Sequence, residues 1–135
     1  MVDAQAINDY LAKAAESLEG AESELANRRF NDGANRCYYA CFQAAIAVLL
    51  AAGIQVRSPG GRWRHQTVHA QFVEQLINWR RRYPPSLRRV LTDNMTLRHE
   101  ADYEIDLISE KHAARALRRS REFVTAIQRE EDGSP

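Results

Sequence analysis

Two short segments carry the residue types that can cleave RNA by proton transfer. Residues 64–69 read RHQTVH, and residues 98–103 read RHEADY. A histidine can move protons to or from a ribose 2′-OH and a leaving oxygen, while an arginine stabilises the negative charge that develops on the phosphate. Both groups must reach one phosphate, so the fold decides which segment can serve as a site.

The first segment has suitable residues at a demanding spacing. Arg64 and His69 are separated by five positions, which places them about 140° apart around a continuous α-helix. They can face one phosphate only if Arg64 lies in a loop before the helix begins, and Gly60 and Gly61 permit such a loop. Because the chain has 17 arginines and 4 histidines, a pair at this spacing also arises easily by chance.

The same segment offers a weaker metal-site pattern. His65 and His69 are four positions apart, so they share a helical face as metal-binding histidine pairs do. No Glu follows the first His, and no Asp or Cys follows the pair at a typical ligand spacing. A glycine-rich phosphate loop, a Cys-x-x-Cys pair and a serine nucleophile elbow are also missing from the sequence. We therefore expect neither a metal site nor a cofactor.

Hydrophobic periodicity predicts that helices position both segments. The third helix, which carries residues 64–69, is bounded by a Ser-Pro-Gly-Gly loop and by Pro84-Pro85. The other expected helices run from about Asp3 to Asn27, from Ala34 to Ala52 with Gly53 as the stop, from Ser86 as N-cap to Tyr103, and from Ser109 onward. A turn is expected at residues 31–33 and a frayed tail at 130–135. The chain is thus predicted to be a single all-α domain, an antiparallel bundle of four or five helices.

Charge is unevenly distributed although the net charge is only +1. Residues 1–35 hold seven acids and three bases, whereas residues 54–92 hold eight arginines and a single acid, Glu74. Arginine suits phosphate, so this basic band favours contact with an anionic partner such as RNA. A solvated face, or the arginine usage of a GC-rich genome, remains the alternative explanation.

The remaining composition favours a cytoplasmic protein without a membrane segment. The longest apolar run, residues 44–53, is about half as long as a membrane-spanning helix requires, and the first residues do not resemble a secretion signal. Cys37 and Cys41 lie four apart in the apolar second helix, where they are expected to be small core residues.

Three segments, taken together, carry a more specific pattern. Residues 35–44 read NRCYYACFQA, residues 65–72 contain His-x-x-Val-x-x-x-Phe, and residues 98–103 contain Arg-x-x-Ala-Asp-Tyr. In this order and at these separations they resemble a prokaryotic branch of the HEPN family over about residues 5–128. The resemblance implies an all-helical domain that usually forms a homodimer. It also implies a gene neighbour encoding a small nucleotidyltransferase, with which the domain forms a toxin and antitoxin pair.

The resemblance also implies a position for the active site. Many HEPN proteins are metal-independent ribonucleases whose signature is an Arg, then four to six residues of which the first is polar, then a His. In the family this signature lies before or at the start of the late helix, and two copies converge in the dimer cleft. Here Arg98 and His99 occupy the first two places, but Tyr103 stands where the His is expected. These three are the candidate catalytic residues, although a tyrosine with a pKa near 10 is a poor base at neutral pH.

The candidate residues for binding RNA or phosphate surround that segment. They are Asn35, Arg36, Arg62, Arg64, His65 and His69. If a nucleotidyltransferase partner exists, family analogy makes Tyr103 a candidate acceptor of a nucleotide.

Structural explanations for the same residues stay open. Arg98 and Asp102 can form an i,i+4 ion pair above Tyr103, and Asn35 and Arg36 can form hydrogen bonds across the bundle. The corresponding alternative function is a catalytically silent module that dimerises and docks a nucleotidyltransferase or a larger complex.

Overall fold

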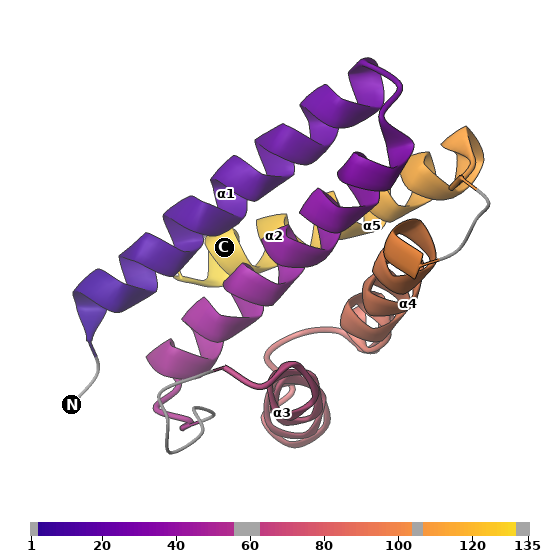
Figure 1. The fold of residues 1–135 in the computed structure, drawn as a ribbon. Coiled ribbons are helices and arrows are strands. Elements are labelled where there is room, and N and C mark those ends of the chain that lie inside the picture. The colour runs from indigo at the N-terminus through magenta and orange to yellow at the C-terminus, as the bar shows by residue number, and fades with distance from the viewer. Residues whose placement is uncertain (1–2, 56–62, 104–106, 132–135) are drawn as a thin grey trace.

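The computed structural model describes residues 3–55, 63–103 and 107–131, apart from the side chain of Tyr103. Their elements are α1 (Ala4–Ala26), α2 (Phe30–Ala51), α3 (His65–Gln71), the π-helix η1 (Phe72–Trp79), the 3-10 turn η2 (Pro85–Leu87), α4 (Val90–Tyr103) and α5 (Glu110–Glu131). Figure 1 shows them as a bundle of helices, which confirms the predicted all-α fold.

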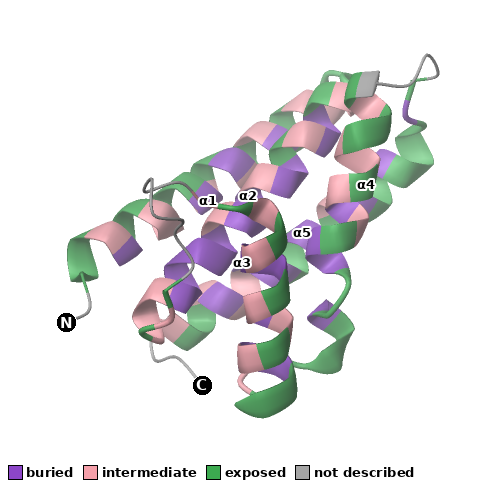
Figure 2. Cartoon of the chain, turned by 60° about the horizontal axis from the view of Figure 1, so that its bottom comes forward, coloured by how far each residue is buried: buried purple, intermediate pink, exposed green. Residues whose placement is uncertain are grey.

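Helix α2 is the centre of the bundle. It packs against α1, α3, α4 and α5, and its residues from Ala44 to Leu49 are all buried. Figure 2 shows buried positions facing the interior and exposed positions on the outer faces of the surrounding helices. An almost entirely apolar helix can avoid water only in such a central place, as the sequence pattern predicted.

The prediction of a turn at residues 31–33 is wrong, because α2 begins at Phe30, four residues before the predicted start at Ala34. The reversal between α1 and α2 lies at Asn27–Arg29, where Arg28 adopts the left-handed conformation with φ 61°. Gly33 is helical and buried, and a Cβ atom there would collide with the side chain of Leu25. This glycine therefore permits close packing of α1 on α2 and does not form a turn.

The end of α2 follows the prediction. Gly53 has φ 75°, and the next amide, that of Ile54, donates to the carbonyl of Leu49 at 2.9 Å. This is the pattern in which a left-handed glycine lets the chain satisfy the last helical carbonyls.

Two of the later helix boundaries differ from the prediction. Ser86 lies within the 3-10 turn η2, and α4 begins at Val90, so Ser86 is not its N-cap. The predicted frayed tail does not begin at Glu130, because α5 reaches Glu131, and Arg82 contacts both Glu130 (3.2 Å) and Glu131 (3.6 Å). The ion pairs with Arg82 thus stabilise the last residues of α5, Glu130 and Glu131, which are not apolar and cannot be held by core packing. The rest of the predicted tail, residues 132–135, lies outside the described residues.

Other predictions are confirmed. The amide of His112 donates to Ser109 Oγ at 3.1 Å, which makes Ser109 a capping side chain for α5. Cys37 and Cys41 are buried in the core as free thiols. None of the helices within the described ranges has the length and apolar character needed to cross a bilayer.

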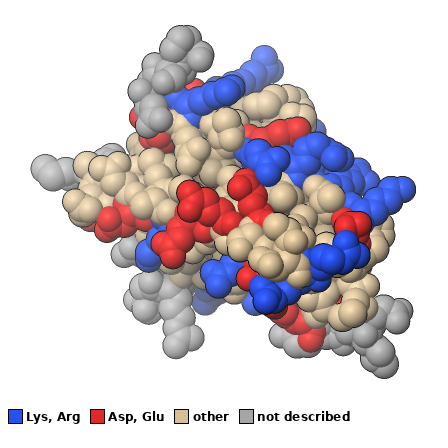
Figure 3. Space-filling model, turned by 90° about the horizontal axis from the view of Figure 1, so that it is seen from above, with Lys and Arg blue, Asp and Glu red and all other residues tan. Residues whose placement is uncertain are grey.

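Acidic and basic side chains gather in separate groups on the surface. Figure 3 shows acidic side chains in the middle of one face and a broad group of basic side chains beside them. The described arginines of the predicted basic band lie directly before α3, in the segment after η1 and directly before α4, while Arg57 and Arg62 lie outside the described residues. Part of the band is neutralised, because Arg82 and Arg89 form ion pairs with acids.

Candidate functional site

Arg98 is held by two polar side chains from neighbouring positions of the bundle. Its Nε donates to Asn35 Oδ1 at 3.2 Å and lies 3.8 Å from Asp102 Oδ2. Asn35 Nδ2 in turn donates to Asp102 Oδ1 at 3.0 Å. Helix α2 supplies the asparagine and α4 the arginine and the aspartate, so the expected ion pair exists, as does the cross-bundle hydrogen bond expected for Asn35.

Two tyrosine rings of α2 complete the surroundings of Arg98. The guanidinium carbon lies 5.1 Å from the ring centre of Tyr39 and 5.7 Å from that of Tyr38. Such contacts favour the guanidinium through the negative face of the ring. The side chain of Arg98 remains 23% exposed, so a fixed positive charge is still open to a ligand. We call Arg98, Asn35, Asp102 and Tyr39 the Arg98 cluster.

A second polar group lies beside this cluster and joins α2 to α3. Tyr38 Oη lies 2.5 Å from His65 Nδ1 and 2.8 Å from His69 Nε2. The imidazole of His65 also stacks on the ring of Phe42, with 4.4 Å between ring centres and 9° between the planes. We call Tyr38, His65 and His69 the Tyr-His group.

Burial keeps the two imidazoles neutral. Removal from water lowers the pKa of His69 to about 4, and the neighbouring His65 adds to this effect. The pKa of His65 is lowered first by burial and then by the nearby positive charges of Arg98 and His99. Burial likewise raises the pKa of Tyr38, although Arg98 opposes the rise. At neutral pH, both imidazoles and the phenol are therefore uncharged.

Arg64 and His69, the two ends of the segment 64–69, lie in different surroundings. Arg64 precedes α3 in extended conformation, as an Arg and His pair at this spacing requires. His69, however, is buried and turned toward Tyr38, whereas Arg64 is exposed. The segment 64–69 instead supplies His65 to the ring of Tyr38, which Arg98 also contacts.

A hollow of about 590 Å³ lies between α1, α2 and α4, with Arg98 at its wall. Its lining residues are Ser17, Glu24, Asp32, Asn35, Arg36, Tyr39, Gln43 and Arg98. The stem of Arg36 lies close to Gly20 of α1. Two arginines and two carboxylates line this hollow, so its charge is mixed.

The other candidate residues have different outcomes. His99 is exposed on α4 and contributes to the lowering of the pKa of His65. Tyr103 is the last residue of α4, but its side chain lies outside the described residues, as does the whole of Arg62. Their roles, like the catalytic and binding roles of the others, stay predictions.

Sequence reasoning missed the contributions of Tyr38 and Tyr39. Both lie in the segment that carries the family resemblance, yet a periodicity argument assigns them to the core of an apolar helix. Their adjacency was the available signal, because neighbouring helical residues point about 100° apart and two rings can flank one guanidinium.

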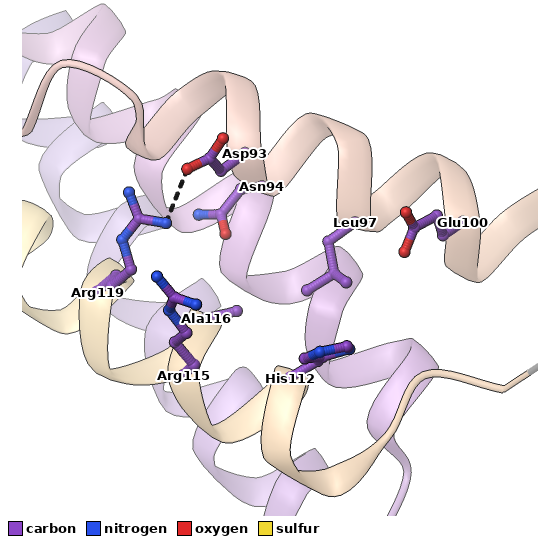
Figure 4. A pocket seen from close by; sticks show the side chains of 8 residues that line it. All are labelled: Asp93, Asn94, Leu97, Glu100, His112, Arg115, Ala116 and Arg119. Atoms are coloured by element: carbon purple, nitrogen blue, oxygen red, sulfur yellow. Dashed lines mark hydrogen bonds and ion pairs between the residues drawn. The ribbon is translucent and has the colours of Figure 1, made fainter.

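A second hollow of about 260 Å³ lies between α4 and α5. Its lining residues are Asp93, Asn94, Leu97, Glu100, His112, Arg115, Ala116 and Arg119. In Figure 4 the arginines and histidine of α5 face the acids of α4, and Arg119 Nη1 contacts Asp93 Oδ2 at 2.9 Å. We call this the α4/α5 hollow.

Comparison with known proteins identifies the family. The model of the HEPN domain matches residues 7–130. A protein of Methanocaldococcus jannaschii that bears the name "Putative toxin MJ0605" is 26% identical over 119 residues, which span 86% of this chain and 81% of that relative. With its helical bundle and a family match over nearly its whole length, the chain belongs to the HEPN domain family.

Proposed function

We propose that this protein is a toxin that binds RNA at the Arg98 cluster and cleaves it by transesterification without a metal ion. The observation that carries the proposal is the position of Arg98. Its guanidinium is fixed by Asn35 and Asp102, remains partly exposed, and contacts the ring of Tyr38, which the imidazole of His65 also contacts. An immobilised positive charge beside a neutral imidazole is what phosphate cleavage requires.

Family membership supports the same function. The chain is a HEPN domain, and its Methanocaldococcus relative is named as a toxin. We infer that a second copy of the chain forms a homodimer with it, and that a small nucleotidyltransferase acts as the antitoxin. In that pair, Tyr103 at the end of α4 is the proposed acceptor of a nucleotide. The transferred nucleotide would be a bulky group on a residue that lies five positions after Arg98 in the sequence.

RNA cleavage by the purified protein in EDTA tests the proposal. We expect the parent to cut RNA and Arg98→Ala to lose most of that activity, because Arg98 stabilises charge in the transition state. Arg118→Ala, which removes an exposed arginine of α5, is the matched control and should behave like the parent. A parent protein that leaves RNA intact would contradict the proposal, and RNA binding without cleavage would favour the catalytically silent module.

A further inference from the structure

The hydroxyl of Tyr38 lies between two histidine nitrogens. Its distances to His65 Nδ1 and His69 Nε2, 2.5 and 2.8 Å, both correspond to hydrogen bonds. A phenol carries one proton, so it donates to one imidazole and must accept from the other. The tautomers of the two histidines are therefore coupled, and when one nitrogen facing Tyr38 carries a proton the other does not.

The orientation of His65 is fixed as well as its tautomer. Nδ1 faces Tyr38, and the ring lies nearly parallel to Phe42. Among the described residues, the hydrogen bonds of His65 involve Nδ1 alone, and the side chain is only partly buried. Nε2, on the other side of the ring, is thus left for a ligand.

This imidazole is also placed beside the Arg98 cluster. Both the guanidinium of Arg98 and the imidazole of His65 contact the ring of Tyr38, at 5.7 and 5.5 Å between centres. The expected family histidine is replaced by Tyr103, so the segment at 98–103 lacks an imidazole at that place. Helix α3 brings one, from a different part of the chain, to the same Tyr38 ring that Arg98 contacts.

We propose that His65 Nε2 is the general base of the cleavage reaction, and that Tyr38 and His69 position it by holding the proton of His65 on Nδ1. In this arrangement His65 Nδ1–H donates to Tyr38 Oη, and the Tyr38 hydroxyl donates to His69 Nε2. The inference rests on the proposed ribonuclease function and supplies the base that function needs.

The proton and electron transfers balance in a single transesterification. The ribose 2′-OH gives its proton to His65 Nε2, and its oxygen forms a bond to phosphorus. The bond from phosphorus to the 5′-oxygen breaks, and that oxygen leaves with the bonding electrons and takes a proton from water. The products are a 2′,3′-cyclic phosphate and a 5′-hydroxyl, and the imidazolium returns its proton to the hydroxide that remains.

The surroundings set the pH range in which this base works. The groups that face or influence His65 are Tyr38 from α2, His69 from α3, and Arg98 and His99 from α4. Burial, Arg98 and His99 all disfavour a charged imidazole, so the pKa of His65 lies below its usual value. We expect cleavage to fall only as the pH drops through that lowered value, because the base is neutral above it.

Nitrogen-15 NMR of the histidine side chains tests the tautomer without reference to activity. At pH 7 we expect the proton of His65 on Nδ1 and none on Nε2, with the signals assigned by their loss in His65→Gln. In Tyr38→Phe this preference should weaken, because the acceptor for Nδ1–H is gone. A proton on Nε2 in the parent would overturn the proposal, since that nitrogen then has no lone pair for the 2′-OH.

Cleavage assays then separate this inference from the proposed function. His65→Ala should cut RNA about 10²- to 10⁴-fold more slowly, and added imidazole should restore part of the rate. His65→Gln, which keeps a polar side chain of similar size, should remain slow and serves if the alanine variant folds poorly. His112→Ala, an exposed histidine of α5, is the control and should match the parent.

The two possible failures have different signatures. If the parent cuts, Arg98→Ala does not, and both His65 variants cut at the parent rate, the base lies elsewhere while the ribonuclease function stands. If the parent leaves RNA intact, the proposed function and this inference fail together.

Discussion

The Arg98 cluster and the α4/α5 hollow contain similar residue types in different settings. Each has an arginine, an aspartate and an asparagine, and each lies near a histidine. In the α4/α5 hollow Arg119 contacts the carboxylate of Asp93 directly at 2.9 Å. In the Arg98 cluster the carboxylate of Asp102 is 3.8 Å from the arginine and is also bound by Asn35.

The difference lies in what each arginine can still do. Arg119 is already paired with a close carboxylate, so little of its charge is available to an anion. Arg98 is held mainly by a neutral amide and by aromatic rings, which fix its position and leave its charge for a ligand. Composition alone therefore does not distinguish a site from a structural ion pair, and the following changes test that distinction.

The largest expected effect separates the two arginines. Arg98→Ala should lower the rate of RNA cleavage about 10²- to 10³-fold, as removal of a transition-state charge stabiliser typically does. Arg119→Ala should stay within about threefold of the parent rate, because Arg119 takes no part in the proposed chemistry. Single-turnover cleavage in EDTA measures both, and equal losses in the two variants would erase the proposed difference between the regions.

A second prediction concerns the pH dependence of stability. The pKa of His69 is lowered from 6.5 to about 4 in the folded chain, so the unfolded chain binds more protons between these values. The free energy of unfolding should therefore fall as the pH drops from 6.5 to 4, by about 3 kcal/mol for this group. Urea titrations at several pH values measure the fall.

Variants identify the origin of that pH dependence. His69→Gln should flatten the decline, whereas His112→Gln, in the α4/α5 hollow, should keep it. If the decline persists unchanged in His69→Gln, burial of His69 is not its source.

The two asparagines should give opposite patterns. Asn94 is buried and its amide donates to Ser120 Oγ at 2.9 Å, so Asn94→Ala should cost about 1–3 kcal/mol of stability and leave cleavage nearly intact. Asn35→Ala should slow cleavage about 10- to 100-fold by loosening Arg98, with a smaller loss of stability. Thermal unfolding and cleavage, measured on both proteins, reveal whether function and stability separate in this way.

The smallest effect is expected from the partly exposed ion pair of the α4/α5 hollow. Asp93→Asn should change the free energy of unfolding by less than about 1 kcal/mol, because pairs near the surface gain little over their hydrated charges. Chemical denaturation can resolve this value. A loss of several kcal/mol would mean that Asp93 and Arg119 anchor α4 to α5 far more strongly than their exposure indicates.

Local chemistry made much of the fold predictable. The spacing of apolar residues defined the helices, and Gly53 and Ser109 marked a helix end and a helix start that the structure has. The turn predicted at Asn31-Asp32-Gly33 was wrong because these residues also suit the first turn of a helix. Gly33 is needed there for close packing and does not form a turn. The prediction of Ser86 as the N-cap of the fourth helix was wrong because the chain forms a 3-10 turn there before α4 begins.

What the sequence determined by itself is the helical bundle, its apolar central helix and the two segments that carry arginine and histidine. Periodicity and residue type are properties of neighbours along the chain, so they are visible without coordinates. Tertiary packing was needed to bring His65, from one segment, and Arg98, from the other, against the ring of Tyr38, and to let the Tyr38 hydroxyl join His65 to His69. These contacts depend on how α2, α3 and α4 pack, and residues about 30 positions apart meet only after the core has formed.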